Sequence, residues 1–195
     1  MKKTLILMIA VSLLSLFCSC GQLTTEYTDP QDYETVWSGT GPWLQAHHYY
    51  EGVSPLFPQT LDGLHISDFY GYYREKLPVG EAIQIYVAVC YDTQEDFERE
   101  LARIETVAPI EDSEHFACPA AVAALGWQNC MEYALVDREN LTVRYIYMEF
   151  CNLDEIEIPA DCLPVGYKDN CCLEDGTSFI VYDEPVWPYD ESEET

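Results

Sequence analysis

The clearest pattern in the chain is a repeat of large apolar residues at every second position, over residues 81–91. One face of this segment, at a period of two, consists of Ile83, Ile85, Val87, Val89 and Tyr91. That alternation predicts a β-strand. The other face is also mostly apolar, with Ala82, Tyr86, Ala88 and Cys90. Because a strand that is apolar on both faces needs cover on both sides, we expect it in the interior of a sheet.

A helical period follows over residues 93–107. Its apolar stripe consists of Phe97, Leu101, Ile104 and Ala108, which recur at the spacing of one helix face. Thr93 and Asp96 have the spacing of a capping box, and Pro109 ends the helix because proline cannot continue it.

The remaining pattern is dominated by strands, and those predicted span residues 66–77, 129–136, 141–151 and 177–182. The first of these also fits a short helix, but its aromatic content favours a strand. A turn over 137–140 joins two of them into a hairpin. The Ala-rich segment 116–125 fits either a strand or a helix, and the aromatic-rich segment 36–61 predicts loops and short helical turns. The fold class predicted is therefore α+β: a mainly antiparallel sheet with one principal helix, about 93–107, packed on one face.

The N-terminus has the organisation of an export signal. Lys2 and Lys3 precede a run of 13 apolar or weakly polar residues, too short to span a membrane as a helix. The sequence Phe17-Cys18-Ser19-Cys20-Gly21 that follows resembles the cleavage box of bacterial lipoproteins. The resemblance implies a signal peptide over 1–19, cleavage after Ser19 and a lipid on Cys20. An ordinary secretory signal and an uncleaved anchor are the alternatives.

These features predict the organisation of the whole chain. A lipid-anchored tether spans 20–35, a single domain spans 36–188, and a disordered acidic tail spans 189–195. The expected location is the extracytoplasmic face of the cell membrane, where acyl chains on Cys20 hold the protein to the bilayer.

Charge narrows the choice of partners. The 195 residues include 9 Lys+Arg and 35 Asp+Glu, a net charge of −26. Removal of 1–19 takes away two lysines and no acid, which leaves 7 − 35 = −28. Nucleic acid is excluded because its binding depends on basic groups, and self-repulsion predicts a monomer.

Seven of the nine cysteines remain unmodified in the mature chain. Because seven is odd, at least one thiol cannot form a disulfide within the chain. Cys90, Cys130 and Cys151 lie in apolar, strand-like segments and are interpreted as small buried hydrophobes. The candidates for a disulfide are Cys162, Cys171 and Cys172. A zinc site is the alternative there, although no Cys-x-x-Cys pair or nearby histidine supports it.

Reactive groups are sparse in the sequence. His47 with Glu51 has a spacing that can hold a metal ion on a helical turn, with His48 beside them. Cys118 lies three residues after His115, but no known nucleophile motif surrounds it. Local hydrogen bonding and packing are the simpler interpretation of both groups. We therefore assign no catalytic or metal-binding residue.

No cofactor is predicted, and weak calcium binding by acidic clusters stays open as an alternative. The carboxylates concerned are Asp154, Glu155, Glu157, Asp161, Asp169, Glu174 and Asp175.

Two stretches carry a resemblance to a family. One runs from residues 83–92 into 97–104, and the other from 131–137 into 145–147. Together they resemble small lipoproteins and secreted proteins of anaerobic Bacillota with no known activity, over roughly residues 56–167. The resemblance implies the fold and an envelope location, and it carries over no functional residue.

The function expected from the sequence is that of a cell-envelope lipoprotein, a non-catalytic binding or structural module tethered at the surface. Aromatic residues near the tether could form a contact surface or pack in the core: Trp37, Trp43, Tyr49 and Tyr50. The alternatives are an envelope hydrolase with an unidentified site and an accessory subunit of an envelope complex.

Overall fold

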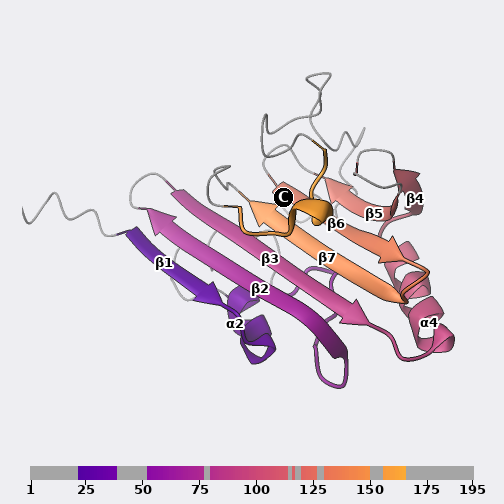
Figure 1. Cartoon of the computed structure of the whole chain (residues 1–195). Coiled ribbons are helices and arrows are strands. Elements are labelled where there is room, and N and C mark those ends of the chain that lie inside the picture. The colour runs from indigo at the N-terminus through magenta and orange to yellow at the C-terminus, as the bar shows by residue number, and fades with distance from the viewer. Residues whose placement is uncertain are drawn as a thin grey trace, which may run out of the picture.

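A single antiparallel sheet organises the protein (Figure 1). The computed structural model describes residues 22–38, 52–76, 80–113, 116, 120–126, 130–149 and 156–165. The seven strands in these ranges are β1 (Gln22–Tyr27), β2 (His65–Lys76), β3 (Gly80–Cys90), β4 (Ile110–Ser113), β5 (Ala120–Gly126), β6 (Cys130–Asp137) and β7 (Thr142–Glu149). Their order across the sheet is β1-β2-β3-β7-β6-β5-β4, and every neighbouring pair is antiparallel.

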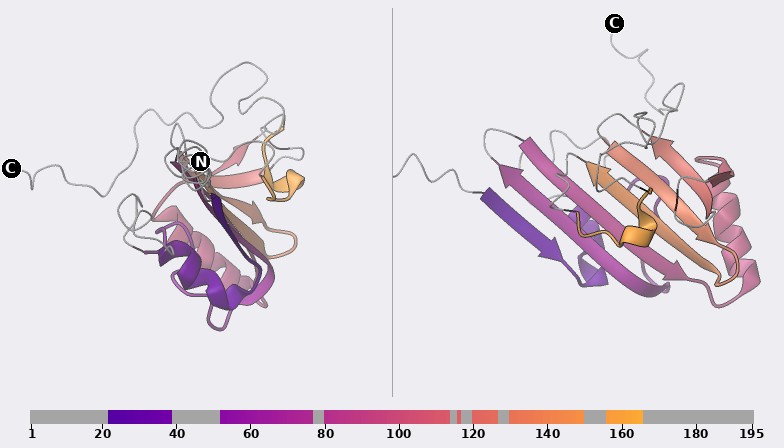
Figure 2. Two further views of the ribbon diagram at one scale, coloured as in Figure 1. Left: turned by 90° about the vertical axis from the view of Figure 1, so that its left-hand side faces the viewer. Right: turned by 45° about the horizontal axis from the view of Figure 1, so that its top comes forward.

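Both faces of the sheet are covered (Figure 2). Helices α2 (Tyr33–Ser38) and α4 (Gln94–Glu105) lie on one face, and the segment 156–165 lies on the other. That segment contains the short 3₁₀ turn η3 (Ala160–Cys162), and another, η1 (Pro30–Asp32), leads into α2. The described part of the chain is thus a mainly antiparallel sheet with helices on one side, as the sequence predicts at this coarser level.

The first core lies between the sheet and the two helices. From the helices it receives Val36, Trp37, Phe97, Leu101 and Ile104, and from the loop between α2 and β2 it receives Leu56 and Phe57. From β3 it receives Ile83, Ile85, Val87 and Val89. Trp37 is only 1% exposed, and its ring lies 4.9 Å from Phe57 and 5.4 Å from Tyr147, centre to centre. Of the four aromatics proposed for a contact surface, Trp37 therefore belongs to the core.

The second core lies beneath the segment 156–165. This segment contributes Ile156, Ile158, Cys162 and Leu163, which pack on Tyr86, Tyr133, Ile146 and Met148 of the sheet. Two polar contacts hold it: the Glu157 backbone N–H donates to Gln84 Oε1 at 3.0 Å, and the Tyr133 hydroxyl donates to the Cys162 carbonyl at 2.6 Å. Because β3 supplies side chains to both cores, its predicted interior position is confirmed.

Cys162 corrects the disulfide prediction. Its thiol is free and fully buried, with its sulfur 3.9 Å from the Tyr86 hydroxyl oxygen. Burial raises the pKa of this thiol to about 11. The residue packs as a small hydrophobe, the role that the sequence analysis gave to Cys90, Cys130 and Cys151. Cys90 is half-buried, with its sulfur 3.4 Å from the Thr142 hydroxyl. Cys171 and Cys172 lie outside the described residues.

Helix α4 occupies Gln94–Glu105, within the predicted range 93–107. Thr93 caps it, because its hydroxyl accepts from the backbone N–H of Asp96 at 3.1 Å. Arg99 forms an ion pair with Asp96 three residues earlier. Helix α2 is a second helix that the prediction of one principal helix did not include.

Helix α2 approaches β2 closely at Gly71. A Cβ atom on this glycine would lie 2.7 Å from Val36 Cγ2 and 3.3 Å from Tyr27 Cβ. The missing side chain therefore makes room for α2 and β1 on the sheet.

The β6–β7 hairpin is confirmed, with Asp137 paired to Thr142 across its turn. Asp137 Oδ1 accepts from the backbone N–H groups of Glu139 and Asn140 at 3.2 and 3.0 Å, as expected of a turn aspartate. Strand β5 covers the second half of the ambiguous segment 116–125 and extends to Gly126, while β4 was not predicted. The predicted strand over 177–182 lies outside the described residues, as do the predicted signal peptide over 1–19 and the predicted acidic tail over 189–195.

The prediction that residues 20–35 form a tether is wrong for most of this range, because it contains strand β1 and the start of helix α2. Residues Gln22–Tyr27 pair with β2 along their whole length, and Tyr33 in α2 is 2% exposed. Exposed Thr24 and Glu26 gave this edge strand the polar character of a linker. An edge strand with one face in solvent keeps that character, because only some of its side chains need to be apolar.

Within the described ranges, every helix is too short or too polar to cross a lipid bilayer.

Candidate functional site

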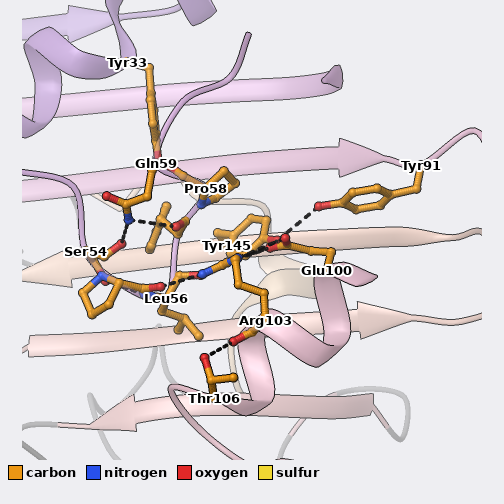
Figure 3. A network of polar contacts seen from close by, with 12 residues as sticks. Tyr33, Ser54, Leu56, Pro58, Gln59, Tyr91, Glu100, Arg103, Thr106 and Tyr145 are labelled. Atoms are coloured by element: carbon orange, nitrogen blue, oxygen red, sulfur yellow. Dashed lines mark hydrogen bonds and ion pairs between the residues drawn. The ribbon is translucent and has the colours of Figure 1, made fainter. Parts of the chain in front are cut away.

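The richest group of polar contacts lies where helix α4 meets the loop before β2 (Figure 3). Glu100 and Arg103 are three residues apart on α4, so both point from the same side of the helix. They flank the apolar stripe that packs into the first core, and their side chains are 14% and 32% exposed. The helix therefore holds an ion pair at the margin of the core.

Arg103 binds the loop through both of its terminal nitrogens. Nη1 donates to the Pro55 carbonyl and Nη2 to the Leu56 carbonyl, each at 2.6 Å. Nε donates to both carboxylate oxygens of Glu100 at 3.0 Å. Burial acts to lower the pKa of Arg103, but the hydrogen bonds and charge of Glu100 outweigh it, so the pKa lies above its ordinary value. The guanidinium stays charged, and each of its three nitrogens donates to the loop or to Glu100.

Two tyrosines extend this network across the sheet. The Tyr145 hydroxyl on β7 donates to Glu100 Oε1 at 2.5 Å, and the Tyr91 hydroxyl oxygen lies 3.4 Å from that of Tyr145. Because the single proton of Tyr145 lies toward Glu100, Tyr91 is the donor of the second contact. Burial, with the nearby Tyr91 and Glu100, raises the pKa of Tyr145 well above its ordinary value. Both phenols are therefore neutral donors at physiological pH.

A second contact fastens the same loop from the sheet side. The Ser54 hydroxyl donates to the carboxylate of Glu132 on β6, and it accepts from the Leu56 backbone N–H at 3.1 Å. The Ser54 carbonyl accepts from Gln59 Nε2 at 3.1 Å. The Tyr33 hydroxyl of α2 donates to the Pro58 carbonyl at 2.7 Å. Residues 54–59 are thus fixed by α2, α4 and β6 together.

This arrangement acts as a clamp, which we define as Glu100, Arg103, Tyr145, Ser54 and Glu132. A serine nucleophile needs access to its substrate, but Ser54 is fully buried. All three guanidinium nitrogens of Arg103 donate to the loop carbonyls or to Glu100, so the guanidinium serves to hold the loop. What the clamp does is hold Leu56 and Phe57, both fully buried, against the sheet.

Most of the residues singled out in the sequence lie outside the part of the chain that the structure describes. His47, His48, Glu51, Trp43, Tyr49 and Tyr50 lie outside the described residues, as do His115, Cys118 and Cys20, the residue that the sequence predicts to be acylated. Of the calcium candidates, Glu157 and Asp161 are exposed, and Asp154, Glu155, Asp169, Glu174 and Asp175 lie outside the described ranges. No three His, Cys, Asp or Glu side chains of the described part are grouped so that they could hold a metal ion.

The clamp was missed in the sequence, although one signal was present. Glu132 is the single charged residue in the strand Met131-Glu132-Tyr133-Ala134-Leu135-Val136. An acid at a position facing a core needs a hydrogen-bonding partner, which could have marked Glu132 as structurally important. Its partner Ser54 is 78 residues away and no local pattern identifies it.

Comparisons with models of protein families, with curated proteins and with solved structures give no match.

Proposed function

We propose that this chain is a lipoprotein of a bacterial cell envelope, acylated at Cys20, with a folded domain that serves as a non-catalytic binding or structural module. One observation carries the proposal: the basic residues, the 13-residue apolar run and the sequence Phe17-Cys18-Ser19-Cys20 occur in the order of a lipoprotein signal. A small residue before Cys20 suits cleavage there, whereas Phe17 is too large for cleavage before Cys18.

The start of the fold supports the same processing site. Strand β1 begins at Gln22, so cleavage after Ser19 leaves all seven described strands intact. The main polar network also favours a structural role, because its charged groups hold a loop against the core. In this proposal the domain lies on the extracytoplasmic face of the membrane as a monomer, without nucleic acid or a cofactor.

Metabolic labelling with an alkyne-bearing fatty acid tests the proposal in bacteria that express the full chain. The wild type should take up the label, lose residues 1–19 and fractionate with membranes. Cys20→Ala should remain an unlabelled precursor. Cys18→Ala is the matched control, because it removes a neighbouring thiol and should still be labelled. Labelling and normal processing of Cys20→Ala would overturn the proposal.

A further inference from the structure

The distance along the chain between the proposed lipid and the sheet is very short. This inference rests on the proposed acylation of Cys20. Consecutive Cα atoms are 3.8 Å apart, so the two residue steps from Cys20 to Gln22 span at most about 7 Å. Since Gln22 is the first residue of β1, the acyl chains leave the protein beside the end of a paired strand.

The register identifies which end of the sheet this is. Gln22 pairs with Lys76, and Lys76 pairs with Gly80. Glu149 pairs with Ile83 near the start of β3 and with Cys130 at the start of β6. The near end of the sheet therefore consists of the strand ends Gln22, Lys76, Gly80, Cys130 and Glu149.

The far end contains the opposite ends of the same strands. His65 pairs with Cys90, Cys90 with Thr142, and Thr142 with Asp137. The turn 138–141 and the start of α4 at Gln94 follow directly from these residues. In Figure 1 the two ends lie at opposite sides of the sheet, with β1 starting at the left and the β6–β7 turn at the right. Ten residue steps along β3 correspond to about 33 Å.

Charge favours an upright arrangement on an anionic membrane. Exposed acids at the far end are Asp92, Glu95, Glu98 and Glu139, and they outnumber the exposed bases Arg99 and Arg138. The surface potential of anionic lipids decays over a Debye length of about 8 Å at physiological ionic strength. Acids about 33 Å away are outside this range, whereas a sheet lying flat would bring them into it. Repulsion therefore lifts the end that the lipid does not hold.

We propose that the near end of the sheet rests on the phospholipid headgroups and that the far end is directed away from the membrane. The turn 138–141, His65 and the first turn of α4 then form the part of the domain that meets soluble partners. The lipid acts as a pivot at the corner where β1 begins.

Depth-dependent quenching on vesicles tests this arrangement. The acylated protein is placed in vesicles of phosphatidylcholine and phosphatidylglycerol that contain a lipid with a nitroxide headgroup. A dye is attached through an azide-bearing amino acid at Thr24 or at Glu139, since both positions are exposed and lie near opposite ends. We expect strong quenching at Thr24 and little at Glu139. Equal quenching, or stronger quenching at Glu139, overturns the arrangement.

A linker variant provides the matched control. Insertion of about twenty Gly and Ser residues between Gly21 and Gln22 frees the sheet from the bilayer. Quenching at Thr24 should fall at least severalfold, and an unchanged value would contradict the role of the short connection. Flotation of the same samples separates the two proposals. Failure to float overturns the acylation and this inference with it, whereas a floating protein with equally quenched dyes overturns the orientation alone.

Discussion

The Ser54 hydroxyl donates a hydrogen bond to the Glu132 carboxylate, and both side chains are closed off from solvent, at 0% and 2% exposure. This bond joins the loop before β2 to strand β6, which lies next to the central strand β7 in the sheet. With Arg103 it makes the clamp that keeps Leu56 and Phe57 in the first core. Substitutions in the clamp should therefore lower stability by releasing this loop from the core.

Ser54→Ala should lower the free energy of unfolding by about 1–3 kcal/mol, because a buried carboxylate loses a hydrogen-bond donor. Urea denaturation followed by tryptophan fluorescence measures the change. Ser67→Ala is the matched control: Ser67 is exposed, and its hydroxyl donates to the Ala88 carbonyl at 3.2 Å. That control should change stability by no more than about 0.5 kcal/mol. Equal effects of the two substitutions would show that the Ser54 bond is unimportant.

Arg103→Lys should loosen the loop, because one ammonium cannot reproduce two guanidinium bonds to the Pro55 and Leu56 carbonyls. Hydrogen exchange of the Leu56 amide should accelerate about tenfold or more, as expected for the loss of a charged hydrogen bond worth about 1.5–3 kcal/mol. Arg99→Lys, at a side chain that is 68% exposed, should leave this rate unchanged. An unchanged rate in Arg103→Lys would mean that the core and the contacts of Ser54 and Tyr33 hold the loop without the Arg103 bonds.

Gly71→Ala should destabilise the protein by about 1–3 kcal/mol, since the new Cβ would overlap Val36 and overpacked sites relax poorly. A β-branched side chain in a helix has little rotamer freedom with which to move aside. A double-mutant cycle with Val36→Ala tests the cause, because the smaller side chain should recover part of the loss. Additive effects would mean that the two residues do not compete for the same space.

Alkaline pH should unfold the protein partly through Tyr145. Its pKa is raised by burial in the fold, whereas the unfolded chain ionises near the ordinary value of about 10. The stabilisation by the neutral phenol is therefore complete below about pH 10 and is lost as pH rises from there toward the folded-state pKa.

Tyr145→Phe tests this dependence. The variant should be less stable at neutral pH, because Glu100 loses a donor, and its stability should fall less steeply above about pH 10. Denaturant midpoints measured across the alkaline range give both slopes. Parallel curves for the variant and the wild type would show that ionisation of Tyr145 does not contribute to the loss of stability at alkaline pH.

Local patterns explain which parts of the fold could be predicted. Strand β3, helix α4 and the β6–β7 hairpin each carry their signal within a few residues: two apolar faces, a capped apolar stripe, and two strands around a turn aspartate. Strands β1 and β4 were missed because both are short edge strands with exposed polar side chains. Periodicity is weak where only one face of a strand is buried and few residues are present.

The clamp could not be predicted for a different reason. Glu100 and Arg103 resemble any helical ion pair at a spacing of three, and nothing near them in the sequence points to carbonyls 47 and 48 residues earlier. Trp37 likewise could belong to a surface or a core until the contacts of Phe57 and Tyr147 were known. Long-range packing decides such roles.

The strand order has a consequence for how the chain is made. Strand β3 is complete at Cys90, but the strand that covers its edge begins at its partner Thr142, 52 residues later. At about 5–20 residues per second, a ribosome needs roughly 3–10 s to synthesise that interval. Throughout it, an apolar strand with an open edge can pair with any other strand it meets. Both pairings of the central strand, β7 with β3 and β7 with β6, thus become available only when β7, the last of the described strands, has been made. Until then, the open edge of β3 exposes a growing chain to misassembly.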